Sequence, residues 1–161
     1  MKIFSEMPDD ARVWIYQANR NLSVGENSQI VDSVSAFIDD WTSHGKSMDA
    51  SFEILMNRLV VIAVDEKQAM ASGCGIDKSV NFMKSLGADM GIDFFVRTQV
   101  LYIVGGKIME SPLHVFWASK KAGNILDDTI VIDTTVKNLG ELRSRLEVPF
   151  KDSWHAEMWH R

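Results

Sequence analysis

Residues 50–64 read ASFEILMNRLVVIAV, and this stretch decides how the chain folds. Ala50–Met56 and Leu59–Val64 are dominated by apolar residues, and only Asn57-Arg58 separates them. Two such segments joined by a short connection predict a β-hairpin. Because the second segment is apolar without interruption, we expect it to be a central strand of a sheet.

Two segments before the hairpin show a regular pattern. Arg12–Ala18 is rich in β-branched and aromatic residues and ends at Asn19, a common turn residue, which predicts a first strand. From Ser28 to His44 the apolar residues recur at the spacing of one helical face, and Gly45 follows as a left-handed cap. That face consists of Ile30, Val31, Val34, Phe37, Ile38 and Trp41. We therefore expect a helix over residues 28–44.

After the hairpin, a second amphipathic helix and another strand follow. The apolar face of this helix is marked by Val80, Met83, Leu86 and Met90. Asp77 is its candidate N-cap and Gly91 its stop. Thr98–Val104 has the composition of a strand, and Gly105-Gly106 turns the chain back through Lys107–Met109. The order βαββαβ predicts a ferredoxin-like core, an antiparallel sheet with two helices on one face.

The remaining third predicts a helix-strand-helix extension of this core. A helix opens at Ser111-Pro112 and runs to Gly123, because Ser can cap a helix and Pro suits its first turn. Thr129–Thr135 follows as a strand, and a short helix lies around Asn138–Leu146. The tail, residues 148–161, has no clear period. With no linker and no internal repeat, we expect one α+β domain over residues 1–161.

Composition limits the compartment and the partners. The 161 residues are 46% hydrophobic, so one domain can bury roughly two-thirds of the surface that its unfolded chain exposes. A single cysteine excludes an intrachain disulfide, and residues 1–10 hold too short an apolar run for a secretory signal. The longest purely apolar run is Leu59–Val64, and the net charge is −5. We expect a soluble cytoplasmic protein that binds neither membrane nor nucleic acid.

The only cysteine, Cys74, lies between two glycines directly before the second predicted helix. A thiol near the positive end of a helix dipole gains reactivity. In the ferredoxin-like topology, the loop Ser43–Ser47 and the loop Asp65–Asp77 lie at the same end of the sheet. Their chemistry-bearing residues are candidates for one site. They are His44, Lys46, Asp65, Glu66, Ser72, Gly73, Cys74, Gly75 and Asp77.

Each of these residues also has an ordinary structural role. A single cysteine is often a buried hydrophobic residue. His44 and Lys46 suit a helix C-terminus, and Asp77 suits an N-cap. Asp65 and Glu66 suit a solvated turn, and the glycines of the second loop suit a tight one. The chemical alternative has Cys74 as the nucleophile, His44 as its base or orienting group, and Lys46 with the loop amides holding an anion. The sequence leaves both alternatives open.

Two further motifs carry no chemistry. Gly45-Lys46-Ser47 matches the end of the phosphate-loop signature GxxxxGK[ST], but the first glycine of that signature falls at Asp40. The motif also closes a predicted helix, whereas a phosphate loop opens one, so we expect no ATP hydrolysis. His155 and His160 are five residues apart, on different faces of a helix, and no cysteine completes a zinc set. We expect neither a metal nor a cofactor.

Four segments resemble a known group of proteins. They are MPDDARVWIYQANR (residues 7–20), FIDDWTSHGKS (37–47), DEKQAMASGCGIDKSV (65–80) and VPFKDSWH (148–155). Together they are similar to small bacterial proteins of unknown function that are often labelled automatically as ABC transporter ATPases. The resemblance spans most of the chain and departs mainly over Gly105–Leu126. It implies a stand-alone cytoplasmic domain, while the ATPase label lacks the complete phosphate loop that it requires.

Two classes of function follow from these expectations. The first is a module that binds a small ligand or another protein, with the open face of the sheet closed by the C-terminal third or by a second copy of the chain. The alternative is a small cysteine-dependent enzyme or thiol sensor that acts on an anionic metabolite through Cys74. The tail residues Phe150, Trp154 and Trp159 either dock on the body of the protein or form a partner surface.

Overall fold

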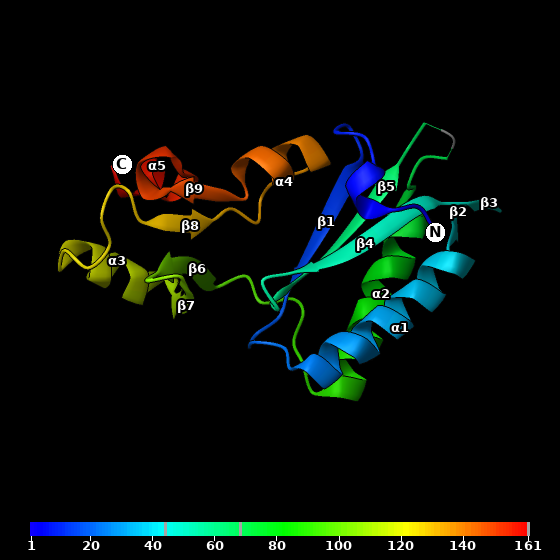
Figure 1. Ribbon diagram of the computed structural model, residues 1–161, viewed down its shortest axis with the longest axis horizontal. Coiled ribbons are helices and arrows are strands. Elements are labelled where there is room, and N and C mark those ends of the chain that lie inside the picture. The colour runs from blue at the N-terminus through cyan, green and yellow to red at the C-terminus, as the bar shows by residue number, and fades with distance from the viewer. Residues whose placement is uncertain (44, 68, 161) are drawn as a thin grey trace. The chain divides into compact units, whose positions relative to one another are not determined.

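The chain forms two compact units of mixed α and β structure. A computed structural model describes residues 1–43, 45–67 and 69–160 (Figure 1). Unit 1 comprises Met1–Val96 with Lys137–Gly140, and unit 2 comprises Arg97–Val136 with Glu141–Arg161. An α+β class is therefore confirmed. The expectation of a single α+β domain over residues 1–161 stays a prediction.

The sheet of unit 1 is built around the predicted hairpin. Its strands are β1 (Arg12–Gln17), β4 (Asp49–Leu55) and β5 (Leu59–Asp65), in the order β1-β5-β4 and antiparallel throughout. All seven residues of β5 are buried, as expected for a central strand. The connection, residues 56–58, is one residue longer than predicted, and Met56 and Asn57 within it have positive φ, at 58° and 51°.

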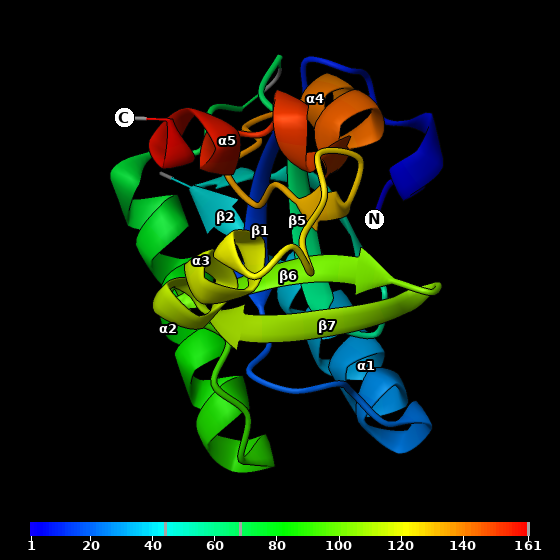
Figure 2. The same cartoon turned by 90° about the vertical axis from the view of Figure 1, so that its left-hand side faces the viewer.

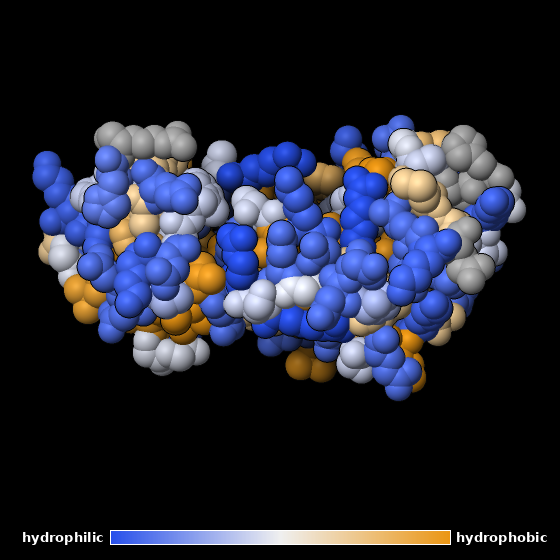
Figure 3. All heavy atoms as spheres, turned by 90° about the horizontal axis from the view of Figure 1, so that it is seen from above, coloured by the Kyte–Doolittle hydropathy of each residue, from blue (hydrophilic) through white to orange (hydrophobic). Residues whose placement is uncertain are grey.

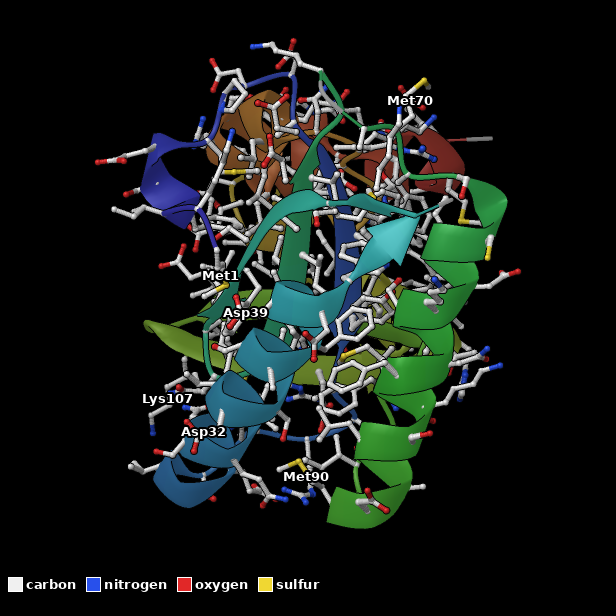
Figure 4. All side chains as sticks on the ribbon, turned by 90° about the vertical axis from the view of Figure 1, so that its right-hand side faces the viewer. Met1, Asp32, Asp39, Met70, Met90 and Lys107 are labelled. Atoms are coloured by element: carbon white, nitrogen blue, oxygen red, sulfur yellow. The ribbon has the colours of Figure 1, made fainter. Side chains whose placement is uncertain are left out.

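Two helices, α1 (Val24–Asp40) and α2 (Gly73–Met90), lie side by side on one face of this sheet and run antiparallel (Figure 1, Figure 4). They pack onto the sheet through alternate residues of β5, namely Val60, Ile62 and Val64. The helices contribute Ile30, Val34, Ile38, Met83 and Leu86. The short 3-10 helix η1 (Phe4–Glu6) precedes β1 and contacts β4.

The prediction of a helix over residues 28–44 with Gly45 as its cap is wrong at both ends. α1 begins four residues earlier because Ser23 and Glu26 form a capping box, with the Ser23 side chain accepting from the Glu26 amide at 3.1 Å. It ends at Asp40, and the following Trp41 is extended, with φ −72° and ψ 120°. Gly45 has the predicted positive φ, 78°, but lies between two-residue strands, β2 (Thr42–Ser43) and β3 (Lys46–Ser47).

The expected fourth strand does not join the sheet of unit 1. β6 (Gln99–Val104) instead belongs to a separate antiparallel sheet with β7 (Lys107–Pro112), β8 (Ile130–Ile132) and β9 (Glu147–Pro149), in the order β7-β6-β8-β9. The free edge of β1 receives isolated bridges, Gln17 to Phe95 and Arg12 to Asn138. The ferredoxin-like sheet is therefore not confirmed, and unit 2 is more than an extension.

Unit 2 also contains short helices, namely α3 (Leu113–Lys121), η2 (Phe150–Asp152) and α5 (Trp154–Trp159). The helix α4 (Leu139–Arg145) begins in unit 1 and continues into unit 2 at Glu141. The α3 helix contacts β6 and β7, which form a hairpin through Gly105 and Gly106 as predicted (Figure 2). The prediction that Ser111 caps α3 is wrong. Ser111 is the fifth residue of β7, and the N-cap position falls on Pro112.

The core of unit 2 takes in part of the tail that showed no period. Phe116 and Phe150 are fully buried, with ring centroids 6.0 Å apart, and Trp159 packs on Trp117 at 5.5 Å. These tail rings dock on unit 2. Figure 3 shows a surface on which hydrophilic side chains predominate. Among the described helices, none is long and apolar enough to cross a membrane.

We predict that Trp41→Ala lowers the free energy of unfolding of unit 1 by about 3–5 kcal/mol, because it removes a large buried side chain. The Trp41 side chain is 2% exposed, and its Nε1 donates to the Gly75 carbonyl oxygen at 3.0 Å. Trp41→Phe is the control that keeps an aromatic ring without the donor, and it should cost less. Urea denaturation followed by circular dichroism measures both. Wild-type stability in Trp41→Ala would contradict this packing.

Candidate functional site

Cys74 is exposed and is the second residue of the 18-residue helix α2. The helix begins at Gly73 because Ser72 is its N-cap, with Ser72 Oγ accepting from the Gly75 amide at 3.2 Å. The prediction that Asp77 is the N-cap is therefore wrong, since Asp77 is an exposed residue inside α2. A Cβ added at Gly73 would meet no atom within 4 Å, so packing does not require glycine there.

The meeting of the two predicted loops stays a prediction, and the structure shows contacts of neighbouring residues with α2. β2 contacts α2, and the Trp41 Nε1 hydrogen bond to Gly75 ties the end of α1 to the first turn of α2. Lys46 is exposed on β3. His44, the predicted base, lies outside the described residues. Lys46 and Ser47 are strand residues, so GKS does not stand between a strand and a helix start as a phosphate loop does.

The two carboxylates that end β5 are engaged in holding the following turn. Asp65 is 7% exposed; its Oδ1 accepts from the Lys67 amide at 3.2 Å, and its Oδ2 is 3.7 Å from Lys2 Nζ. Glu66 Oε2 accepts from the Ala71 amide at 2.8 Å and lies 3.7 Å from Arg12 Nη1. These contacts fit the structural role of both residues, and a ligand-binding role for them stays a prediction.

A groove between α1 and α2 was not anticipated from the sequence. It has a volume of about 780 Å³, within the range of small-molecule sites. Its walls are one stripe of each helix, at the i, i+3, i+4, i+7 spacing of a helical face. It is lined by Ser33, Ala36, Phe37, Asp40, Trp41, Lys78, Asn81, Phe82 and Ser85.

Three aromatic rings form the floor of this groove. Phe37 and Phe82 are stacked across the two helices, with centroids 4.4 Å apart and planes 10° apart. Trp41 lies next to Phe37, with centroids at 5.3 Å. Figure 4 looks onto the two helices and shows aromatic rings in the space between them. Phe37 and Phe82 are only partly buried, so part of their surface is open to a ligand.

The rim of the groove carries one charge of each sign. Asp40 is the last residue of α1, and Lys78 lies on the second turn of α2. Because the helices are antiparallel, the negative end of the α1 dipole and the positive end of the α2 dipole lie at the same end of the groove. Cys74 precedes Lys78 by four residues, so it lies on the same α2 stripe one turn beyond the groove.

Phe82 is the residue whose position in the sequence could have indicated the groove. It stands beside Met83 of the apolar face predicted for this helix, while Phe37 was assigned to the buried face of its own helix. An aromatic residue one position off a core stripe indicates a second contact, here the neighbouring helix. In the described parts of the chain, no three His, Cys, Asp or Glu residues group as a metal site would need.

Comparisons of this chain with protein families, with curated proteins and with solved structures found no match. The resemblance to the small bacterial proteins therefore stays a prediction, and function has to be argued from the geometry.

We predict that Ser72→Ala destabilises unit 1 by about 1 kcal/mol, because it removes the N-cap of α2. Asp77→Ala is the matched control: it changes an exposed residue without a capping bond, and its effect should stay within about 0.5 kcal/mol. Thermal or urea unfolding of the two variants measures the difference. A larger cost for Asp77→Ala would instead make Asp77 the N-cap of α2.

Proposed function

We propose that this protein is a small-molecule-binding module and that its ligand occupies the groove between α1 and α2. The observation that carries the proposal is the aromatic floor, three rings at the bottom of a groove of about 780 Å³. Apolar and aromatic walls with a few placed polar groups are typical of ligand sites. Rings left partly open to solvent keep apolar surface in water, which a ligand would cover.

The ligand class follows from the walls and the rim. A flat apolar ring suits a floor of aromatic faces and edges, since such rings favour offset or edge-on contacts. An anionic group would pair with Lys78, which also lies near the positive end of the α2 dipole. Asp40 on the facing helix disfavours a second negative charge. The proposed ligand is therefore a small aromatic monoanion or zwitterion, in line with the anionic ligand expected from the sequence.

The finer description of the fold belongs to this proposal. The order β1-β5-β4, antiparallel and with α1 and α2 on one face, agrees with three of the four strand positions of a ferredoxin-like sheet. Unit 1 is thus proposed as a ferredoxin-like core. In place of a fourth strand beside β1, Phe95 and Asn138 form isolated bridges with that strand. Cytoplasmic location, a homodimer through the sheet face, and the lack of membrane or nucleic-acid partners stay predictions.

Ligands that share one ring and differ in charge test the proposal. Phenylacetate (anion) and phenylalanine (zwitterion) should bind more tightly than phenethylamine (cation), and all should shift the amide NMR signals of α1 and α2. Lys78→Gln should weaken phenylacetate binding by up to about fivefold, the worth of one exposed charge pair. The assigned ligand charge would be wrong if the wild-type protein bound all three ligands equally tightly and Lys78→Gln changed none of these affinities.

A blocking variant tests the groove itself. Ala36 is exposed and lines the groove, so Ala36→Trp should fill it and abolish binding without disturbing the core. Val31→Trp is the matched control, because Val31 is 43% exposed on the same helix but does not line the groove. If Ala36→Trp binds phenylacetate as well as Val31→Trp does, the ligand does not occupy this groove.

The second candidate function, thiol chemistry at Cys74, has one observation in its favour, the exposure of Cys74 in the first turn of α2. If Cys74 is a catalytic nucleophile, iodoacetamide should alkylate it several-fold faster than an exposed cysteine in mid-helix. Ser85→Cys in a Cys74→Ser chain supplies that comparison on the same helix. Equal rates would leave Cys74 an ordinary surface thiol and remove the main argument for an enzyme.

A further inference from the structure

Unit 2 contains a buried histidine that neither proposed function uses. His155, in α5, is 2% exposed, and among the described residues its Nδ1 has no hydrogen-bond partner. The imidazole stacks on Trp154, with centroids 3.8 Å apart and planes 27° apart. On the side of α3 it faces Phe116 at 5.6 Å and Trp117 at 6.5 Å. Burial away from water disfavours the charged imidazolium and leaves the neutral imidazole as the favoured form.

The charged groups around this enclosure do not stabilise an imidazolium well. Asp133, after β8, is the carboxylate whose charge acts on His155, but Arg145 Nη2 already binds its Oδ2 at 3.2 Å. From the side of α3 and η2, Lys120 Nζ lies 4.6 Å from the centroid of the Phe150 ring and pairs with Asp127. Burial therefore lowers the pKa of His155 from 6.5 to about 4, and the charge of Asp133 opposes only part of that shift.

The helix that carries His155 is short, and its described contacts come from its N-cap and from two further side chains. α5 has six residues, and Ser153 is its N-cap, accepting from the Ala156 amide at 3.3 Å and donating to the Phe150 carbonyl at 2.7 Å. Beyond His155, it docks through Ala156 and through Trp159, which packs on Trp117. Such a short helix is not stable by itself, so its order depends on this docking.

We propose that protonation of His155 releases α5 from unit 2 in mild acid, so that α5 is an acid-sensitive cover over the aromatic core of unit 2. Release would free the imidazole to take a proton from solvent and would expose apolar surface around Trp117 and Phe116.

The direction of the pH dependence follows from the two protonation states. Above pH 6.5 the imidazole is neutral whether α5 is docked or released, so pH has no effect. Between pH 6.5 and 4 the released state takes a proton that the docked state does not, so docking weakens as the pH falls. The equilibrium constant for release should rise about 30-fold between pH 7.5 and pH 5, and approach a rise of about 300-fold below pH 4.

Amide hydrogen exchange measures this release directly. After correction for the intrinsic exchange rate, the protection factors of the α5 amides in the wild-type protein should fall about 30-fold from pH 7.5 to pH 5. Those of β5 should hold, which separates release of α5 from unfolding of the protein. His155→Phe and His155→Gln carry no titratable ring, so α5 in either should keep its protection at pH 5. His160→Gln is the matched control, since His160 is the exposed histidine next to α5, and it should behave as wild type.

Three outcomes would overturn the proposal. One is an unchanged α5 protection factor in the wild type at pH 5, and another is the same loss of protection in His155→Phe and His155→Gln. The third is a His155 ring that titrates near pH 6.5 by NMR while α5 stays docked, because a docked imidazolium would require a partner. If His155→Phe does not fold, His155→Gln and the NMR titration of the wild type still decide.

Discussion

The complete burial of β5 is the constraint on which unit 1 depends. A strand with all seven residues buried has no water to satisfy its backbone, so both of its edges must be paired. β1 and β4 do this over six and seven residue pairs, in antiparallel register. The register fixes which residues of β5 face α1 and α2, because a slip of one residue would turn Val60, Ile62 and Val64 away from the helices.

The groove between the helices is a consequence of that packing and of one polar contact. α1 and α2 are placed by their buried stripes on β5, and the stripes next to these then face each other above the sheet. The Trp41 Nε1 bond to the Gly75 carbonyl fixes the ring at the end of the groove where both helix termini lie. A buried indole N–H without that carbonyl would lose its hydrogen bond, so the position of Trp41 and the start of α2 are coupled.

Local patterns in the sequence predicted the helices and strands. They did not predict which strands, distant in the sequence, pair with one another. The hairpin, the stop of α2 at Gly91 and the Gly105-Gly106 turn follow from residues next to one another, and all are present. The capping box Ser23-Val-Gly-Glu26 was also readable, and it would have corrected the start of α1. The sheet that Gln99–Val104 joins could not be predicted from the sequence. One of its partner strands, Ile130–Ile132, is nearly thirty residues away along the chain.

In the candidate site, too, local features could be predicted from the sequence and contacts between distant residues could not. Cys74 at a helix start could be read from its neighbours, and it is exposed there. The stack of Phe37 on Phe82 could not, since it joins two helices that are far apart in the sequence and meet only after both have packed on β5. Sequence patterns show which residues face the core. They do not show which residues of two neighbouring core-facing helices are left to form a groove.

Two buried basic side chains, Arg58 and His155, respond differently to pH. Burial lowers the pKa of Arg58 as it does that of His155. Arg58 nevertheless keeps its charge, because an arginine starts far above neutral pH, and it donates to the Ala18 carbonyl and to Asn21 Oδ1 at 3.0 and 3.1 Å. His155 has a neutral form at pH 7, and its Nδ1 has no partner in the part of the chain that the structure describes, so the same burial removes its charge instead. Because the Arg58 guanidinium stays charged at every physiological pH, its hydrogen bonds at the β4–β5 turn do not vary with pH. An imidazole kept neutral by its surroundings leaves the docking of α5 dependent on the proton concentration.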